Sequence, residues 1–260
     1  MTVEWNTLPM ERPVRVDTRP PAPNQPVSLL RRQGYARYKN LAETCLALLL
    51  LLPAVPALLA AALLVKLTSR GPIFYLQKRV GLGGRIYTMY KVRTMFHECE
   101  RLTGPRWATA QDPRITPVGR WLRRFHVDEL PQLWNVLRGE MSLLGPRPER
   151  PEIAKHLERL IPGYRERLAL RPGLTGLAQV QLPPDSDLAS VRRKLAHDLY
   201  YVHRLGLSLD LRILLCTAFR LVGIPFRLTN LLLRLPGGML VEQVYQGAVV
   251  NGTAHGKRLR

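Results

Sequence analysis

An uncharged apolar stretch near the N-terminus places the strongest constraint on how this chain folds. It runs from Cys45 to Val65 as CLALLLLLPAVPALLAAALLV, without a single charged residue. About 20 such residues, wound as a helix, match the thickness of the hydrocarbon core of a bilayer. The stretch begins too far from Met1 for the apolar core of a cleaved signal peptide. We therefore expect a retained membrane helix.

Two prolines argue against a straight crossing of the membrane. Pro53 and Pro56 lack the N–H groups that would bond the carbonyls of Leu49 and Leu52, so the helical ladder should break near its middle. Basic residues flank both ends of the stretch, and such flanks prefer the cytoplasmic side. We predict a re-entrant membrane helix over residues 41–67 that bends back to the side it entered. A kinked full span and a buried helix of a soluble protein are the alternatives.

The charge balance indicates an anionic partner. The chain has 39 Lys and Arg against 19 Asp and Glu, a formal net charge of +20. Nucleic acid, an anionic lipid leaflet or a phosphorylated substrate would each suit such a surface. The three cysteines are scattered without a Cys-x-x-Cys pair, which indicates neither a disulfide framework nor a zinc site. Residues 1–40 are basic and rich in proline, and we expect a flexible tail there.

A β-hairpin is predicted after the apolar stretch. Two β-rich runs flank GLGG within residues 71–95, and glycine suits the positive φ angles of such a turn. Lys91 and Arg93 are two residues apart on the second run, so their side chains should share a face. They could hold one phosphate together, or they could form a solvated edge of the hairpin.

The segment ITPVGRWLRRFHV predicts a helix. Thr116 is a suitable N-cap, and Pro117 is well placed at the first helical position. Four apolar residues then follow helical spacing, which predicts that they face the core: Val118, Trp121, Leu122 and Phe125.

Asp128 and Glu129 stand side by side at the start of the next predicted helix. Pro131 is tolerable only in a first turn, which sets the start at or just before Asp128, and Gly139 is a typical stop. In one interpretation Asp128 caps the helix and Glu129 complements the helix dipole. In the other the two acids do different jobs, because successive helical residues point about 100° apart. One would attack a phosphorus atom, and the other would orient a magnesium ion.

Basic residues are available to balance the charge of a transferring phosphoryl group. Arg147 stands between two prolines in GPRP, which leave its backbone little freedom to lose on binding. That presentation suits phosphate or a nucleobase, and it is equally compatible with a rigid surface turn. The other candidates are Lys91, Arg93, Arg123 and Arg124, with Arg171 of RPGLTG a weaker one.

These motifs, in this order, resemble those of the bacterial sugar transferase family, the monotopic polyprenyl-phosphate phosphoglycosyl transferases. The matching blocks, over residues 68–224, are QKRVG, YKVRTM, DPRITPVGRWLRR, VDELPQLWNVLRGEMSLLGPRP, RPGLTGLAQV and DLYYV. The resemblance implies an enzyme that moves a sugar phosphate from a UDP-sugar to polyprenyl (undecaprenyl) phosphate and releases UMP. This step would start an exopolysaccharide, O-antigen or glycoprotein glycan at the cytoplasmic face of the bacterial inner membrane.

The resemblance also implies roles for single residues. Asp128 would be the nucleophile that forms an aspartyl phosphosugar, and Glu129 the second acid, with Mg²⁺ held at the pair. Lys91, Arg123 and Arg147 match positions that hold phosphate or nucleotide. Two departures occur: His126-Val127 replaces the usual Ser-Leu, and QLPPD stands where many members have a glycine and a basic residue. The second departure leaves the sugar open.

The expected fold is α+β and mostly helical. It combines the re-entrant helix, a catalytic domain over residues 68–224 with a small β-hairpin, and a C-terminal extension over residues 225–260. Residues 208–236 mix apolar surface with arginines, which is typical of helices that lie in a membrane interface and reach anionic lipids. An ordinary amphipathic core helix is the alternative. The arginines are Arg212, Arg220, Arg227 and Arg234.

Two rival functions come from other classes. A membrane-tethered nucleic-acid-binding protein would fit the charge of +20 and would bind with a steep salt dependence. No recognised nucleic-acid module is present in the sequence, so we expect no nucleic-acid partner. An inactive scaffold for glycan assembly would not need the intact acidic pair. The sequence leaves open whether the chain forms a homo-oligomer.

Overall fold

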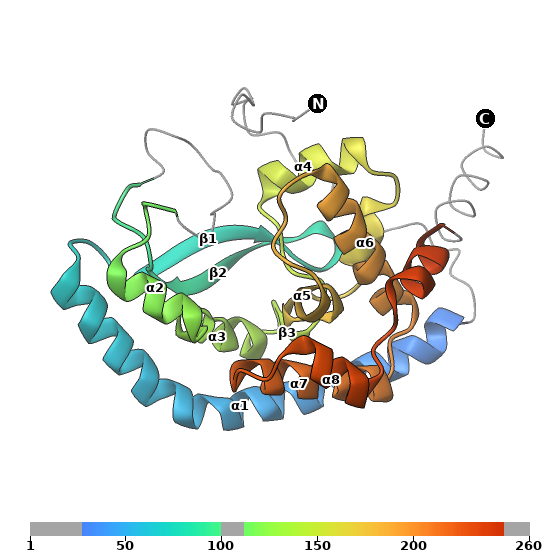
Figure 1. The fold of residues 1–260 in the computed structure, drawn as a ribbon, viewed down its shortest axis with the longest axis horizontal. Helices are drawn as coiled ribbons and strands as arrows, with labels where there is room; N and C mark the ends of the chain where they lie inside the picture. The colour runs from blue at the N-terminus through green and yellow to red at the C-terminus, as the bar shows by residue number, and fades with distance from the viewer. Residues whose placement is uncertain (1–27, 100–111, 247–260) are drawn as a thin grey trace.

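The computed structural model describes residues 28–99 and 112–246, which are mostly helical with two small sheets (Figure 1). Residues 1–27 of the predicted tail and 247–260 of the predicted extension lie outside the described residues. The chain begins with α1 (Ser28–Thr68), β1 (Phe74–Val80), η2 (Leu82–Gly84), β2 (Ile86–Val92), α2 (Pro117–Arg124), η3 (Val127–Glu129) and α3 (Gln132–Leu137). It continues with β3 (Ser142–Leu144), α4 (Pro151–Leu160), η4 (Tyr164–Ala169), β4 (Gly173–Thr175), α5 (Leu177–Gln181), α6 (Leu188–His203), α7 (Leu207–Leu221) and α8 (Phe226–Leu233). The mostly helical fold with a small hairpin is confirmed.

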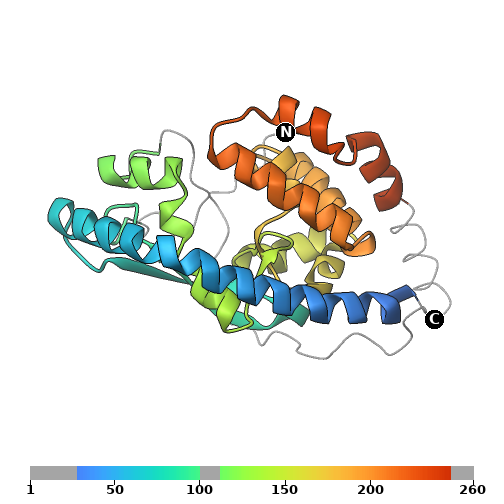
Figure 2. The ribbon, with the colours of Figure 1, turned by 90° about the horizontal axis from the view of Figure 1, so that it is seen from below.

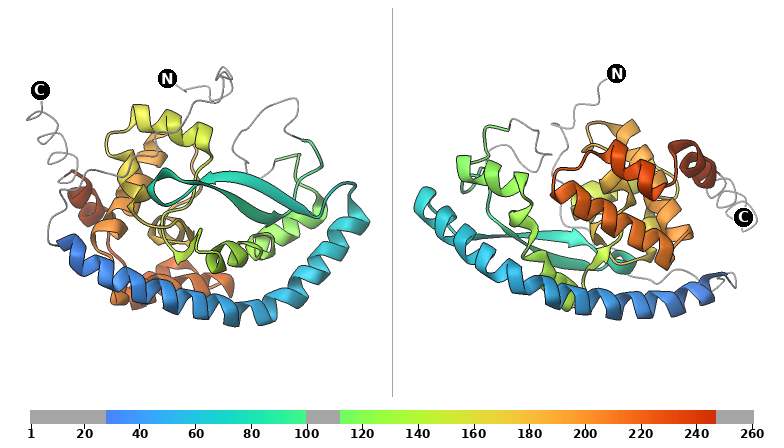
Figure 3. Two further views of the ribbon diagram at one scale, coloured as in Figure 1. Left: turned by 180° about the vertical axis from the view of Figure 1, so that it is seen from behind. Right: turned by 60° about the horizontal axis from the view of Figure 1, so that its bottom comes forward.

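Helix α1 corrects two expectations. It is continuous through Pro53 and Pro56, and it curves around the rest of the molecule without reversing (Figures 1 and 3). Each proline removes one backbone hydrogen bond, and the neighbouring turns carry the helix past both sites as a smooth bend. The helix also begins at Ser28, so residues 28–40, assigned to the flexible tail, are helical.

Small residues form the face by which α1 contacts the protein. Ala47, Ala54 and Ala61 recur every seven residues and are buried, whereas leucines such as Leu52 and Leu59 point outward and are largely exposed. Only 17% of the most apolar window of the helix is buried. The alternative of a buried helix of a soluble protein is therefore wrong. The length and composition of α1 suit a membrane span, and insertion itself stays a prediction.

A buried polar cluster joins the N-terminal half of α1 to β3. The Glu43 carboxylate accepts hydrogen bonds from the backbone N–H groups of Leu143 and Leu144, both at 3.1 Å, and pairs with Lys39. Lys39 in turn donates to Ser142 Oγ at 2.7 Å. These contacts tie the helix to the strand that precedes the GPRP turn.

The hairpin and the second sheet position Lys91 and the GPRP turn. Strands β1 and β2 pair antiparallel, and Gly83 and Gly84 take φ angles of 63° and 87° in the turn, so the predicted hairpin is confirmed. Strands β3 and β4 form a short parallel pair, which brings the GPRP and RPGLTG segments together.

Helix α2 begins as predicted but exposes two of its apolar residues. Thr116 accepts a hydrogen bond from the Gly119 N–H at 2.9 Å as N-cap, and Leu122 is fully buried. Trp121 and Phe125 are 52% and 51% exposed, with ring centroids 5.0 Å apart, so the prediction that they face the core is wrong. Helical spacing predicted that these residues lie on one side of the helix. It did not predict that only part of that side is buried.

Helices α7 and α8 lie on the same side of the molecule as α1 (Figure 2). Their exposed residues include several leucines together with all four arginines named above. Tyr35 of α1 donates a hydrogen bond to Asp210 of α7 at 2.8 Å, which joins the two helices. The described part of the chain thus presents exposed apolar side chains and arginines on neighbouring helices, as a membrane interface requires.

Candidate active site

Asp128 lies in η3, the short turn between α2 and α3, and its side chain caps no helix. His126 enters the turn in the left-handed region at φ 55°, and the regular part of α3 begins only at Gln132. The predicted helix start at or just before Asp128 is therefore wrong, and so is the interpretation of Asp128 as its cap. Gly139, at φ 71°, follows the end of α3 as predicted.

The Asp128 side chain is largely buried, and its carboxylate has no hydrogen bond or ion pair with any of the described residues. Burial and the nearby charge of Glu129 raise its pKa, against the opposing effect of Lys91, Arg123 and His126. Its two oxygens are not among the fully buried unpartnered atoms of the described residues, so they keep some access to solvent or substrate. Carboxyl groups with a perturbed pKa of this kind are concentrated at functional sites.

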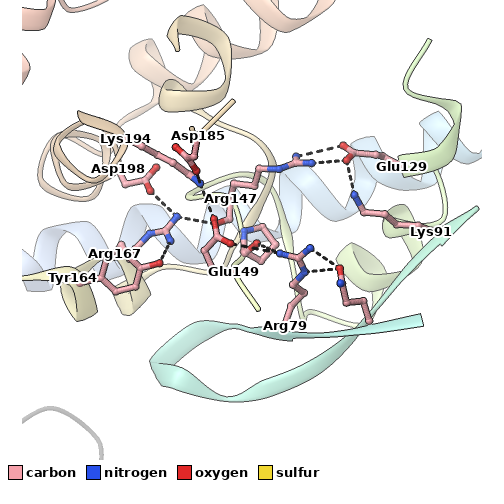
Figure 4. Close-up of polar contacts among 12 residues, drawn as sticks. Arg79, Lys91, Glu129, Arg147, Glu149, Tyr164, Arg167, Asp185, Lys194 and Asp198 are labelled. Atoms are coloured by element: carbon pink, nitrogen blue, oxygen red, sulfur yellow. Dashed lines mark hydrogen bonds and ion pairs between the residues drawn. The ribbon is translucent and has the colours of Figure 1, made fainter. Parts of the chain in front are cut away.

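Glu129 is held firmly, in contrast to its neighbour. Its Oε1 lies 2.7 Å from Lys91 Nζ and 2.6 Å from Arg147 Nη2 (Figure 4). Burial opposes ionisation of this carboxyl, but Arg147 and Lys91 together hold its pKa well below the usual range. Two adjacent acids thus have their pKa values moved in opposite directions, which is typical of paired groups with separate roles.

The cations around the pair come from three parts of the chain. Lys91 lies near the end of β2, Arg147 in the turn after β3, and Arg123 in the last turn of α2. The Arg123 Nε–H donates to Thr94 Oγ1 at 2.8 Å. The charge of Arg123 favours the ionised form of the Asp128 carboxyl.

Arg93 lies elsewhere. Its guanidinium donates to the carbonyl of Ser69 at 2.9 Å and to the carbonyl of Arg70, both at the end of α1. The prediction that Arg93 and Lys91 hold one phosphate together does not match this geometry. The spacing of two residues placed both side chains near one strand end. It could not show that Arg93 would instead bond the carbonyls of Ser69 and Arg70, just after α1.

A buried network of charges behind Arg147 was not predicted. Glu149 pairs with Lys194 at 2.7 Å, and Lys194 pairs with Asp185 at 2.6 Å (Figure 4). Arg167 pairs with Asp198 at 2.7 Å. Burial disfavours the charged form of Glu149, yet Lys194 and neighbouring arginines lower its pKa to about 2. The one signal in the sequence was the presence of charged residues among the apolar positions of α6.

Asp128 and Glu129 are of the ligand type that Mg²⁺ takes. No cluster of three or more His, Cys, Asp or Glu side chains suited to a metal occurs within residues 28–99 and 112–246. Mg²⁺ does not require one, because it usually takes one or two carboxylates and completes its shell with water and substrate phosphates. Asp128 offers a carboxylate that has no hydrogen bond or ion pair within the described part of the chain. Among the same residues, Glu129 Oε2 has one hydrogen bond, from Arg147 Nη1 at 3.5 Å.

Comparisons with known proteins show what the chain is similar to. The model of the bacterial sugar transferase family matches residues 34–223. A UDP-glucose:undecaprenyl-phosphate glucose-1-phosphate transferase from Xanthomonas campestris pv. campestris is 41% identical over 206 residues, which cover 76% of this chain and 43% of that protein.

Two further relatives show how far the similarity extends. A UDP-N-acetylgalactosamine-undecaprenyl-phosphate N-acetylgalactosaminephosphotransferase from Aeromonas hydrophila is 41% identical over 75% of this chain and 46% of its own length. The exopolysaccharide production protein PSS of Rhizobium leguminosarum bv. phaseoli is 42% identical over 64% of this chain and 86% of its own. The chain thus spans less than half the length of the first two relatives.

Proposed function

Because the chain belongs to the bacterial sugar transferase family, we propose that it transfers a sugar 1-phosphate from a UDP-sugar to undecaprenyl phosphate. The reaction releases UMP and yields a lipid-linked diphosphate sugar that starts an exopolysaccharide, O-antigen or other glycoconjugate. The observation that carries this proposal is the largely buried Asp128 side chain, whose carboxylate has no partner among residues 28–99 and 112–246, beside a Glu129 fixed by Lys91 and Arg147.

The proposed reaction has two displacements at phosphorus. A carboxylate oxygen of Asp128 attacks the β-phosphorus of the UDP-sugar, and the bond from that phosphorus to the bridging oxygen breaks, so that UMP leaves with the electron pair. An oxygen of undecaprenyl phosphate then attacks the same phosphorus, and the bond to Asp128 breaks to restore the carboxylate. Covalent catalysis of this kind divides one difficult step into two easier ones.

The cations would bind and orient the diphosphate. Lys91 and Arg147 each use only some of their N–H donors to bind Glu129. Because an ammonium has three donors and a guanidinium has five, donors remain to bind phosphate oxygens. Arg123, whose charge favours the ionised form of Asp128, would stabilise charge on the transferring group. Mg²⁺, held by Asp128 and Glu129, would neutralise diphosphate charge when bound.

Undecaprenyl phosphate is a membrane lipid, so the proposed function requires the protein to lie at a membrane. The exposed apolar side chains support that location. The exposed leucines of α1, together with the leucines and arginines of α7 and α8, would place the site at the cytoplasmic face of the bacterial inner membrane, in contact with anionic lipids. Undecaprenyl phosphate would then reach Asp128 from the leaflet.

A panel of UDP-sugars tests the function. Purified protein in detergent or vesicles, with Mg²⁺ and undecaprenyl phosphate, should release UMP from one donor far faster than from the others. UDP-glucose and UDP-N-acetylgalactosamine are the first two arms, because relatives of equal identity are named for these different sugars. An inactive scaffold would release no UMP from any donor. A nucleic-acid-binding protein would instead bind DNA or RNA with a steep salt dependence.

The pH profile of kcat/KM reports the state of Asp128. Attack requires the ionised carboxylate, and burial raises the pKa of this group above the 3.8 of a free aspartate. As the pH falls, the active form is therefore lost earlier than it would be for an exposed aspartate. We expect the acid limb of the profile clearly above pH 3.8, measured by UMP release under conditions where the fold is intact. An acid limb at or below that value would contradict the assignment.

Arg93→Met separates the end of α1 from the chemistry. The variant loses hydrogen bonds to the carbonyls of Ser69 and Arg70, so its Tm should fall by several degrees. Its kcat/KM at a temperature where it is folded should stay within about threefold of wild type, because no reacting group is touched. The matched variant Lys91→Met should lose far more kcat/KM. Equal losses of kcat/KM in the two variants would show that Arg93 takes part in substrate binding or catalysis, as Lys91 is expected to.

A further inference from the structure

The GPRP turn is held through its backbone, one carbonyl after another. The Pro146 carbonyl accepts from Gly173 N–H at 2.9 Å, and the Glu149 carbonyl accepts from Val80 N–H at 3.0 Å. The two carbonyls between them are bound by side chains. Arg167 Nη2 donates to the Arg147 carbonyl at 2.7 Å, and Arg79 Nη1 donates to the Pro148 carbonyl at 2.8 Å. Four consecutive carbonyls are thus fixed from β1, η4 and β4.

Arg167 is itself held on two further sides. It is 4% exposed, its Nη1 donates to the Tyr164 hydroxyl at 2.9 Å, and Nη2 lies 2.7 Å from Asp198 (Figure 4). Burial disfavours the charge on this guanidinium, but Tyr164 and Asp198 raise its pKa overall. A buried ion pair often adds little net stability compared with apolar residues of the same shape. Its presence here therefore calls for a role other than stability.

Arg167 is linked to the site through Arg147. The Arg147 backbone receives a hydrogen bond from Arg167, and the Arg147 side chain pairs with Glu129 at 2.6 Å. A shift of the turn by about 1 Å would misplace the guanidinium, and misplacement on that scale can cost about 100-fold in rate.

We propose that Arg167 is a positioning residue: it holds the Arg147 backbone so that the Arg147 guanidinium reaches both Glu129 and the diphosphate of the donor. Among the described residues Arg167 contacts Tyr164, Asp198 and the Arg147 carbonyl, and it has no hydrogen bond or ion pair with Glu129. The part of this inference that concerns the donor rests on the proposed function, whereas the part that concerns Glu129 does not.

The test uses the paired variant Arg167→Met/Asp198→Asn. Arg167→Met alone would leave Asp198 buried and charged, so the fold could fail; the pair removes both charges and still removes the donor to the Arg147 carbonyl. We expect its kcat/KM for the UDP-sugar to fall by about 10- to 100-fold. In an Arg147→Met background the same pair should cost less than about threefold, because the side chain it positions is already gone. Arg165→Met, an exposed arginine of the same η4, is the control and should match wild type.

A second readout needs no turnover. In the wild-type background, the Tm losses of Glu129→Gln and Arg147→Met should be less than additive, because both break one ion pair. In the Arg167→Met/Asp198→Asn background the two Tm losses should become additive, since the Glu129–Arg147 ion pair is no longer aligned. If the losses stay equally non-additive there, or if the paired variant lowers kcat/KM by the same factor with and without Arg147, the positioning role is wrong. If wild type releases no UMP, the proposed function fails, and the thermal readout still decides the role of Arg167.

Discussion

Asp128→Asn is expected to abolish UMP release and to make the protein more stable. Removal of a nucleophile leaves no carboxylate to attack phosphorus, and we expect a loss of turnover of about 10³-fold or more. Desolvation in the folded state, together with the charge of Glu129, disfavours the ionised Asp128 carboxyl and raises its pKa, and a neutral amide of similar shape avoids that cost. Gains of roughly 0.5–2 kcal/mol are common for such changes, and about 1 kcal/mol corresponds to a rise of 2–4 °C in Tm for a chain of this size.

The sign of the pH dependence follows from the raised pKa of Asp128. Ionisation of this group is harder in the folded chain than in the unfolded chain, so the folded state loses stability as the pH rises through the raised pKa. The advantage of Asp128→Asn should therefore be full at neutral pH and should disappear in acid, where the wild-type group is protonated.

Asp187→Asn is a matched control for this variant. Asp187 is the exposed N-cap of α6, and asparagine caps a helix about as well as aspartate. Its Tm and turnover should both stay near wild type. Thermal unfolding by circular dichroism and UMP release on the same preparations measure both effects. An Asp128→Asn protein with wild-type turnover, or with a lower Tm, would contradict the account of this residue.

Glu129→Gln is expected to have the opposite effect on stability. The change leaves Lys91 and Arg147 without the carboxylate that neutralises them in a largely buried site. Breaking one side of a buried charge pair typically costs about 3–5 kcal/mol, which lowers Tm on the order of 10 °C here. Turnover should fall as well, since both cations lose their alignment for the diphosphate.

The pH dependence identifies the source of that cost. The pKa of Glu129 lies well below 4.5 in the folded chain, so its contribution to stability is full above the unfolded value and is lost as the pH falls through the folded value. The difference in Tm between wild type and Glu129→Gln should therefore shrink in acid. Glu158→Gln removes an exposed contact of 4.0 Å with Arg165 and should change Tm by little. Equal Tm losses in the two variants would show that the Glu129 pair has no special role.

The parts of the fold that depend on local backbone chemistry could be predicted. Thr116 with Pro117 marked the start of α2, and GLGG marked the hairpin, because each residue type satisfies a local geometric need. The acidic pair could also be found, because two adjacent carboxylates in a basic chain are conspicuous in the sequence. The resemblance to a family then gave these acids roles that spacing alone left open.

Features that depend on distant partners could not be predicted. Arg93 looked like a companion of Lys91 until the end of α1 was placed beside it, and Trp121 looked buried until the width of the packed face of α2 was known. The link from Arg167 to Arg147 joins residues 20 positions apart through a side chain and a carbonyl, which no periodic pattern reveals. Helix α1 passed two prolines without reversing because its small-residue face packs along the protein on both sides of them.

The most direct measurement is the mass of the protein after incubation with its UDP-sugar and Mg²⁺ but without undecaprenyl phosphate. We expect an added sugar phosphate, located by peptide mapping to Asp128 and discharged when the lipid acceptor is supplied. Turnover that proceeds while no such adduct forms at Asp128, even on rapid quenching, would contradict the covalent route.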